Sequence, residues 1–228
     1  MTRSPTSLAF APLALLCLAL SAPLHAAPPT EACTPVFSIS DCAGYLEAEL
    51  LRNHPLLFSR KEGTLKLSLM DGSVRQFNDV PLNDAEDNTE QHVSYALLQY
   101  FPAIGYVLID ASYWEGGTYY LVDIKTGATT DVGGLVALSP DKRRFAVANV
   151  DIEAEYTPNL LAVYQITPDG LMNEFIETPD KWGASDIEWE DNEVVRFSRN
   201  YWGTSAIQKK TQRLRLVGSE PAPAWKIE

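Results

Sequence analysis

The chain contains very few of the residues that build nucleophilic or metal-dependent active sites. Only three histidines and three cysteines occur among 228 residues. No His-x-x-x-His pair, no Gly-x-Ser-x-Gly turn and no Gly-x-Gly-x-x-Gly loop is present, so the signatures of zinc enzymes, serine hydrolases and dinucleotide-binding enzymes are missing. We therefore predict no catalytic residue, no metal site and no cofactor from sequence motifs.

Positive charge is also scarce. The chain has 18 Lys and Arg against 30 Asp and Glu, which gives a formal net charge of −12 at pH 7. A nucleic-acid partner is not expected, because phosphate binding requires a basic surface. A basic protein or another cationic ligand is compatible with this charge and would be attracted to it.

Long apolar runs are confined to the N-terminus. Residues 8–20 are almost continuously apolar, follow Arg3 and precede small residues that end at Ala26 and Ala27. This pattern predicts a secretory signal peptide over residues 1–26. The apolar core is too short to cross a bilayer comfortably. We expect an exported protein, periplasmic or extracellular, with no transmembrane segment in its mature chain.

Two cysteines remain after the leader, Cys33 and Cys42, nine positions apart. In an oxidising compartment this pair predicts a disulfide, which would contribute about 2–3 kcal/mol through loop entropy. The alternative is a pair of free buried thiols.

A repeated hairpin pattern is what the sequence has in abundance. Four β-rich runs each end in a tight turn with glycine, at Gly72, Gly127, Gly170 and Gly218, so the spacings are 55, 43 and 48 residues. Glycine between apolar runs is a strong hairpin signal, because glycine accepts a positive φ without a clash. Periods of this size predict a repeated sheet unit.

The remaining strand-like runs fall into sets. We expect an arm and one helix over residues 27–55, then a single β domain over 56–228 with a partial set at 56–78 and sets of four strands at 94–132, 135–176 and 185 to the end. Three full sets are few for a closed ring. The fold class is therefore predicted as all-β: a small or incomplete propeller-like array of four-stranded antiparallel sheets, with the N-terminal helix able to cover an exposed edge. A β-sandwich is the alternative.

One stretch resembles a known family. Ser139-Pro140-Asp141, between a strand and the run Arg144–Val147 and preceded by the hairpin around Gly127, is similar to a blade of the TolB/WD40-like β-propellers. The resemblance covers residues 118–176. Lys142 and Arg143 stand where that pattern usually has glycine, and the Gly-His and Trp-Asp signatures are absent. The resemblance implies a fold and carries no function by itself.

The predicted topology points to one working face. In a meander, the connections between second and third strands gather at one end of the sheets, opposite the tight glycine turns. These connections, with the link before the last set, carry aromatic and acidic residues, which suit a binding surface on a rigid scaffold. The candidate binding residues are Asp110, Tyr113, Trp114, Glu115, Glu153, Glu155, Tyr156, Trp182, Tyr201 and Trp202. The alternative is that several of these rings fill gaps between sheets.

The sequence favours a non-enzymatic binding protein that recognises a protein or envelope ligand. A periplasmic inhibitor or immunity protein against a basic toxin or hydrolase is one alternative. A hydrolase using Asp110, Asp151, Glu153 or Asp186 is another, and a subunit that pairs through an edge strand is a third.

Two acidic groups raise the question of bound cations. Asp186, Glu188 and Glu190 alternate along one predicted strand, so they share a face and repel one another unless a cation or a basic partner lies among them. Calcium at Asp84, Glu86 and Asp87 is the weaker possibility, because the spacing departs from an EF-hand. The alternative for both acidic groups is a solvated face.

Overall fold

The computed structural model of the protein describes residues 39–83, 89–218 and 223–228. The predicted signal peptide, the N-terminal arm with Cys33, and the acidic loop with Asp84, Glu86 and Asp87 lie outside the described residues. The Cys33–Cys42 disulfide therefore stays a prediction. Cys42 itself is buried in the N-terminal half of the helix, with 2% of its surface exposed.

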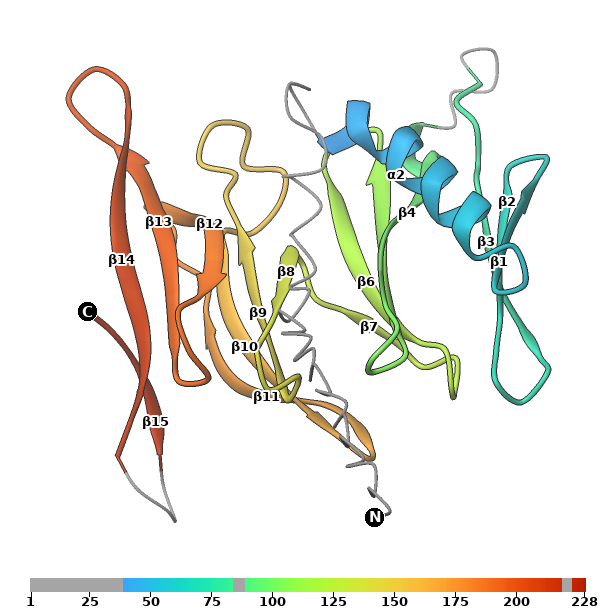
Figure 1. The fold of residues 1–228 in the computed structure, drawn as a ribbon. Coiled ribbons are helices and arrows are strands. Elements are labelled where there is room, and N and C mark those ends of the chain that lie inside the picture. Colours follow the sequence, from blue (N-terminus) through green and yellow to red (C-terminus); the bar gives the residue numbers. More distant parts are fainter. Residues whose placement is uncertain (1–38, 84–88, 219–222) are drawn as a thin grey trace, which may run out of the picture.

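The described chain is one helix, one 3-10 turn and a long series of strands (Figure 1). The helix is α2 (Ile39–Asn53), which lies within the segment 27–55 where one helix was predicted, and the 3-10 turn is η1 (Thr89–Gln91). The strands are β1 (Phe58–Lys61), β2 (Thr64–Ser68), β3 (Val74–Asn78), β4 (Val93–Phe101), β5 (Tyr106–Tyr113), β6 (Gly117–Asp123), β7 (Thr129–Asp131), β8 (Leu135–Leu138), β9 (Arg144–Asn149), β10 (Leu160–Thr167), β11 (Gly170–Glu177), β12 (Trp182–Trp189), β13 (Val194–Trp202), β14 (Ile207–Val217) and β15 (Ala224–Ile227).

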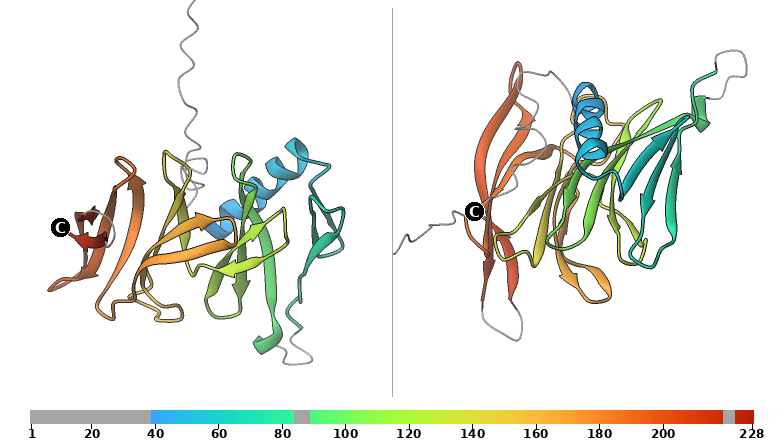
Figure 2. Two further views of the ribbon diagram at one scale, coloured as in Figure 1. Left: turned by 90° about the horizontal axis from the view of Figure 1, so that it is seen from below. Right: turned by 45° about the vertical axis from the view of Figure 1, so that its right-hand side comes forward.

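Consecutive strands form four antiparallel sheets, which we call sheets A (β1–β3), B (β4–β7), C (β8–β11) and D (β12–β15). Sheet A has three strands and the others have four, as the sequence predicted. The sheets stand side by side in chain order, and the array does not close into a ring (Figures 1 and 2). The prediction of an incomplete, propeller-like all-β array is confirmed. The N-terminal strands form their own sheet and do not complete a blade with the C-terminal strands.

The core consists of three apolar clusters, one between each pair of neighbouring sheets. Strand β5 shows how one strand serves two clusters. Its side chains alternate, so that Val107 and Ile109 pack toward sheet A while Tyr106 and Leu108 pack toward sheet C. The inner strands are therefore buried on both faces, which explains their nearly continuous apolar sequences.

The four glycines of the repeated hairpin all adopt a positive φ, between 74° and 117°. They turn β2 into β3, β6 into β7, β10 into β11 and β14 into β15. In Figure 1 these hairpins lie at the lower end of the sheets. The predicted turns are confirmed. They lie together at one end of the array, as the predicted topology requires.

The Ser-Pro-Asp turn connects β8 to β9. Ser139 is buried, and its Oγ donates to Asp141 Oδ1 at 2.6 Å and accepts from the backbone N–H groups of Arg143 and Arg144 at 3.2 and 2.9 Å. Lys142 has a φ of 61°. It therefore occupies the left-handed conformation that glycine would take without strain.

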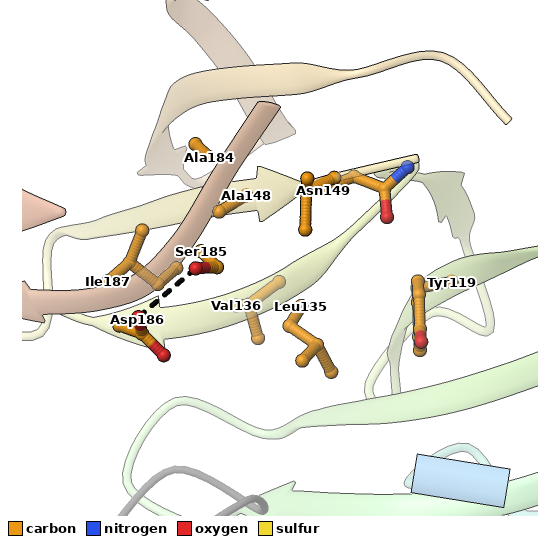
Figure 3. Close-up of a pocket in the computed structure, with 10 residues that line it drawn as sticks. Tyr119, Leu135, Val136, Ala148, Asn149, Ala184, Ser185, Asp186 and Ile187 are labelled. Carbon is orange, nitrogen blue, oxygen red and sulfur yellow. Dashed lines mark hydrogen bonds between the residues drawn. The ribbon is translucent and has the colours of Figure 1, made fainter. Parts of the chain in front are cut away.

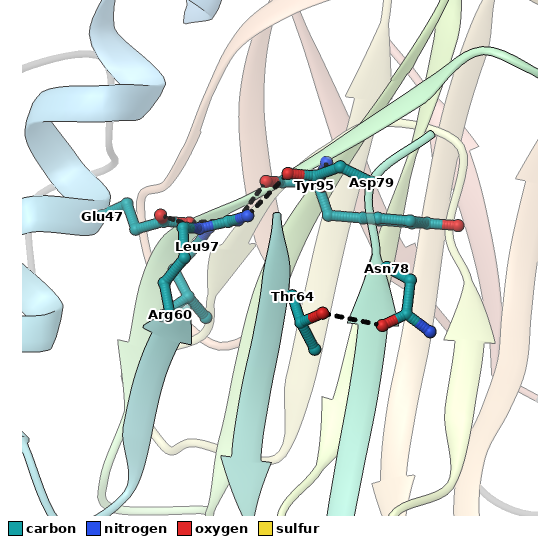
Figure 4. Close-up of polar contacts among 7 residues, drawn as sticks. All are labelled: Glu47, Arg60, Thr64, Asn78, Asp79, Tyr95 and Leu97. Carbon is teal, nitrogen blue, oxygen red and sulfur yellow. Dashed lines mark hydrogen bonds and ion pairs between the residues drawn. The ribbon is translucent and has the colours of Figure 1, made fainter. Parts of the chain in front are cut away.

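Helix α2 lies against β1 and β4 and covers the free edge of sheet B (Figure 4). Glu47 Oε2 accepts the backbone N–H of Leu97 at 3.0 Å, and Asp79 Oδ1 accepts that of Tyr95 at 2.9 Å. Arg60 donates to the carbonyl of Tyr95 and to both carboxylates. Side chains thus form the hydrogen bonds that a neighbouring strand would otherwise make with β4. The edge of sheet B is therefore not left open to pair with another chain.

The outer face of sheet D is covered by cross-strand ion pairs. Each of the three carboxylates of β12 and the following turn has its own basic partner, which is one of the arrangements that the sequence left open for these acids. The pairs are Asp186–Lys209, Glu188–Arg196 and Glu190–Arg213, joined by Glu228–Arg215. The outer face of sheet A is also polar, with Ser59, Lys61, Thr64, Lys66, Gln76 and Asn78. Both ends of the array therefore present polar surfaces to water, like the end caps of repeat proteins.

Candidate functional site

Three connections meet at the end of the array opposite the glycine turns: residues 113–117, 150–159 and 202–206 (Figure 1). We call this surface the loop face. A Cβ built on Gly116 would lie 3.0 Å from Tyr156 Cβ, so the first two connections touch. Trp202 Nε1 donates to the carbonyl of Ile152 at 3.0 Å, which joins the second to the third. The predicted gathering of these loops is what the topology produces.

Asp151 organises the middle connection. Its Oδ1 accepts the backbone N–H groups of Ala154 and Glu155, and its Oδ2 accepts those of Tyr156 and Thr157 at 2.8 and 2.9 Å. Burial alone would raise the pKa of Asp151, but the hydrogen bonds, led by those from Thr157, lower it. The loop is therefore held by one ionised carboxylate.

Four of the predicted aromatic side chains are exposed on the loop face. The exposed fractions are 40% for Tyr113, 56% for Trp114, 57% for Tyr156 and 55% for Trp202. Large rings that are this exposed on connected loops offer apolar area without a covering element.

Two other rings of the predicted site lie deeper, Trp182 and Tyr201. Trp182 is only 6% exposed, because it is the first residue of β12 and its ring stacks on Phe197 in the core between sheets C and D. Tyr201, opposite Trp182 in the ladder, is half-buried against the same core. These two rings therefore follow the alternative prediction: they fill the space between sheets C and D.

Asp110 is 8% exposed on β5, below the loop face. Burial raises its pKa, against the opposing effect of the hydrogen bond that Ser112 Oγ donates to it at 2.7 Å. The neighbouring Tyr119 has its pKa raised to about 12 by burial and by the charge of Asp110. Asp110 is therefore a buried carboxylate that shares no open surface with the exposed rings.

The acidic character of the face comes from Glu115, Glu153 and Glu155, all exposed. Beside them is a pocket of about 630 Å³, whose lining includes Asp151, Glu155 and Asp180. Glu155 has a φ of 58°, a left-handed conformation within the loop that Asp151 holds. The Tyr156 side of the loop face is thus bordered by negative charge.

A smaller pocket of about 190 Å³ lies at the inner edge of sheet C (Figure 3). Its wall is mostly apolar, with Leu135, Val136 and Ile187, and Tyr119 stands at one side. The one acid in the wall, Asp186, accepts a hydrogen bond from Ser185 Oγ at 3.1 Å and forms an ion pair with Lys209 at 2.8 Å. The carboxylate of this pocket is therefore already paired with a cation.

The carboxylates that the hydrolase alternative would use make different structural contacts. Asp151 holds its own loop, Asp186 pairs with Lys209, and Asp110 is buried beside Ser112. Three of the four carboxylates of this alternative are therefore engaged with their own neighbours. No group of three or more metal-ligating side chains was found in residues 39–83, 89–218 and 223–228.

Sequence reasoning missed two features of this end of the molecule. The first is the organising role of Asp151, whose only signal was an Asp at the start of a polar connection. The second is a basic pocket that includes Arg199 and Lys210. Its signal was the alternation of basic residues along β13 and β14, which assigns Arg199 and Arg196 to opposite faces.

Comparisons with protein-family models, with curated proteins and with solved structures gave no significant match. None of the helices among the described residues has the length and apolar character needed to span a bilayer.

Proposed function

We propose that this protein is an exported, non-enzymatic binding protein that recognises a protein partner of the cell envelope through the loop face. The observation that carries the proposal is the group of four exposed rings, Tyr113, Trp114, Tyr156 and Trp202, on three connections that touch one another. Aromatic anchors on a pre-organised surface are the usual centres of protein interfaces.

The hydrogen bonds beneath the rings support this reading. Asp151 fixes the middle loop and Trp202 is anchored to Ile152, so the surface needs little ordering on binding. Lower ordering cost leaves more of the contact energy as affinity.

The charge around the rings favours a basic partner. Glu115, Glu153 and Glu155 are exposed near the rings, and the whole chain has a formal charge of −12. This charge would speed the encounter with a cationic protein. An inhibitor or immunity protein that blocks a basic toxin or hydrolase is the specific form of the proposal that this feature favours.

Further parts of the proposal concern origin and processing. The signal peptide over residues 1–26, the periplasmic or extracellular location and the Cys33–Cys42 disulfide belong to it. So does kinship with the TolB/WD40-like propellers, which is supported by the four antiparallel sheets and by the positive φ of Lys142 in the Ser-Pro-Asp turn.

The test is capture of partners from an envelope extract with the chain lacking residues 1–26. Trp114→Ala should weaken capture of a specific protein by about tenfold or more, as central aromatic contacts do. The matched control is Met172→Ala, because Met172 is 50% exposed on β11, away from the loop face. Equal capture by the wild type and Trp114→Ala, with capture reduced by Met172→Ala, would reject the loop face.

Thermal melts must accompany the capture. Trp114→Ala should change the melting temperature little, whereas Trp182→Ala should cost about 3–5 kcal/mol because its ring is in the core. The captured partner should also bind more weakly at high salt if it is basic. A partner whose binding is insensitive to salt would contradict the inhibitor form.

A further inference from the structure

A basic pocket lies beside the loop face, on the side of the β13–β14 hairpin that faces the connection before β12. Its volume is about 400 Å³, and its lining residues are Lys181, Arg199, Tyr201, Trp202, Lys210 and Gln212. Three of these six are cations and none is a carboxylate. The pocket is therefore opposite in sign to the chain as a whole, which has a net charge of −12.

The guanidinium group in this pocket is held in place. Arg199 Cζ lies 4.5 Å from the centroid of the Trp182 ring, a cation–π contact with a buried aromatic. Gln212 Oε1 is 3.5 Å from Arg199 Nη1, at the limit of a hydrogen bond. The planar donor fork is therefore fixed against the back wall with donors left over for a ligand.

The two faces of the same hairpin differ in charge balance. Arg199 lies directly opposite Lys210 in the β13–β14 ladder, an arrangement of like charges that destabilises a sheet. On the other face of these strands, Arg196 and Lys209 each have a carboxylate partner. Within residues 39–83, 89–218 and 223–228, neither Arg199 nor Lys210 has an ion-pair partner.

The nearest acid in sequence does not neutralise the pocket. Asp180 precedes Lys181, but it is exposed and lines the neighbouring acidic pocket with Asp151 and Glu155. A cation pair that the fold leaves uncompensated, above a buried ring, is the kind of locally unfavourable arrangement that a ligand relieves.

We infer that this pocket binds an anionic group, a phosphate or a carboxylate, through Arg199, Lys210 and Lys181. Arginine binds either group through two parallel hydrogen bonds, and the lysines supply point charges. Tyr201 and Trp202 offer aromatic walls for a flat or apolar part of the same ligand. Trp202 borders both this pocket and the loop face, but the groups that would hold the anion, Arg199, Lys210 and Lys181, are not among the rings that carry the proposed function.

The test is a thermal-melt titration of the chain lacking residues 1–26 with sodium phosphate and with sodium succinate. Sodium chloride at matched ionic strength serves as the reference. We expect a saturable rise in melting temperature with at least one of the two anions. Stabilisation by phosphate alone assigns a phosphate site, and stabilisation by succinate alone assigns a carboxylate site. Equal melting curves in all three salts would overturn the inference.

Neighbouring residues on opposite faces provide the matched variants. Lys210→Gln should weaken the apparent anion affinity at least about fivefold, because it removes one of three cations. Lys209→Gln should change it less than twofold, since Lys209 pairs with Asp186 on the other face. Equal losses in both variants would mean that the response reflects general charge and would refute the site. Trp114→Ala should leave the anion affinity unchanged, which separates this site from the loop face.

A charge reversal gives a second, independent readout. Lys210→Glu replaces the opposed like charges by an ion pair with Arg199, so the melting temperature without added anion should rise. The same variant should no longer respond to phosphate or succinate. A variant that keeps the anion response, or that melts lower than the wild type, would contradict the inference.

Discussion

Lys142 has a strained backbone conformation that glycine would adopt without strain. Its φ of 61° lies in the left-handed region, where a side chain clashes with the backbone. We expect Lys142→Gly to stabilise the protein by about 0.5–1 kcal/mol, the relief of strain less the added chain entropy of glycine. Urea unfolding at pH 7 measures the change.

The control for this substitution is a second exposed lysine in a turn. Lys125, between β6 and β7, does not have a positive φ, so Lys125→Gly should lower the free energy of unfolding through added chain entropy. Opposite signs for the two variants are the expected result. A loss of stability in Lys142→Gly would show that the lysine side chain has a stabilising role in the turn.

Asp151 and Asp110 should respond to pH in opposite directions. The hydrogen bonds of Asp151 lower its pKa, so its contribution is complete above the unfolded value of about 3.9 and is lost as pH falls through the lower folded value. Asp151→Asn should therefore lower the free energy of unfolding by about 1–3 kcal/mol at pH 7. The difference from the wild type should shrink below about pH 4.

Asp110 gives the reverse case. Burial raises its pKa, so the folded state holds its proton to a higher pH and stability falls as pH rises from about 3.9 through the folded value. Asp110→Asn cannot ionise and should therefore be more stable than the wild type at pH 7 and not at pH 3. Urea unfolding of both variants at the two pH values is the measurement. A wild-type advantage at pH 7 over Asp110→Asn would contradict the assignment.

At the scale of single residues, the sequence identified the exposed rings and could not rank their burial. The prediction begins the last set of strands at Ser185, whereas β12 begins at Trp182. Because residues 182–184 belong to the strand, the Trp182 side chain lies in the core and not in a loop. A strand boundary is set by cross-strand partners far along the chain, here Tyr201, so local sequence does not define it.

Among the elements, helix α2 and the edge of β4 form the most specific contact. The Glu47 side chain is 10% exposed and accepts from Leu97 N and Arg60, so its removal leaves a buried N–H and a poorly compensated cation. Glu47→Ala should cost about 2–4 kcal/mol in unfolding free energy. Amide exchange should accelerate at Leu97 in particular.

The matched control lies on the same helix. Glu49 pairs with Arg52 one turn away on the exposed surface, so Glu49→Ala should cost less than about 0.5 kcal/mol. Similar losses from both variants would mean that helix propensity, and not the capping of the edge, accounts for the effect.

The elements themselves were largely predictable because their signals are local. Apolar strand-like runs separated by glycine turns indicated the four sets of strands. The sequence led us to expect that the helix covers an edge. It did not predict which side chains form hydrogen bonds with the edge strand β4. These hydrogen bonds depend on Glu47, Arg60 and Asp79, which meet only after sheets A and B have packed together.

For the whole molecule, the two polar end faces decide whether the array stays a single unit. Replacing two ion pairs on sheet D by valines (Glu188→Val with Arg196→Val, and Glu190→Val with Arg213→Val) keeps the net charge and creates an apolar sheet face. We expect this variant to self-associate, because an uncovered apolar face resembles the surfaces that pack inside the array. Light scattering after size-exclusion chromatography measures the mass.

The control exchanges the charges without removing them. Glu188→Arg with Arg196→Glu preserves a polar face and should have the mass of the wild type. A wild-type mass for the valine variant as well would show that the ion pairs do not keep the end of the array from stacking.

The open ends also bear on the order in which the chain folds. A closed ring would need its first and last segments to meet before any blade is secure, a contact between distant parts of the chain that slows folding. Here each sheet is made of consecutive strands and packs only on the sheet before and after it. The molecule can therefore fold sheet by sheet from the amino-terminal side while the chain is still being made, without waiting for its C-terminus.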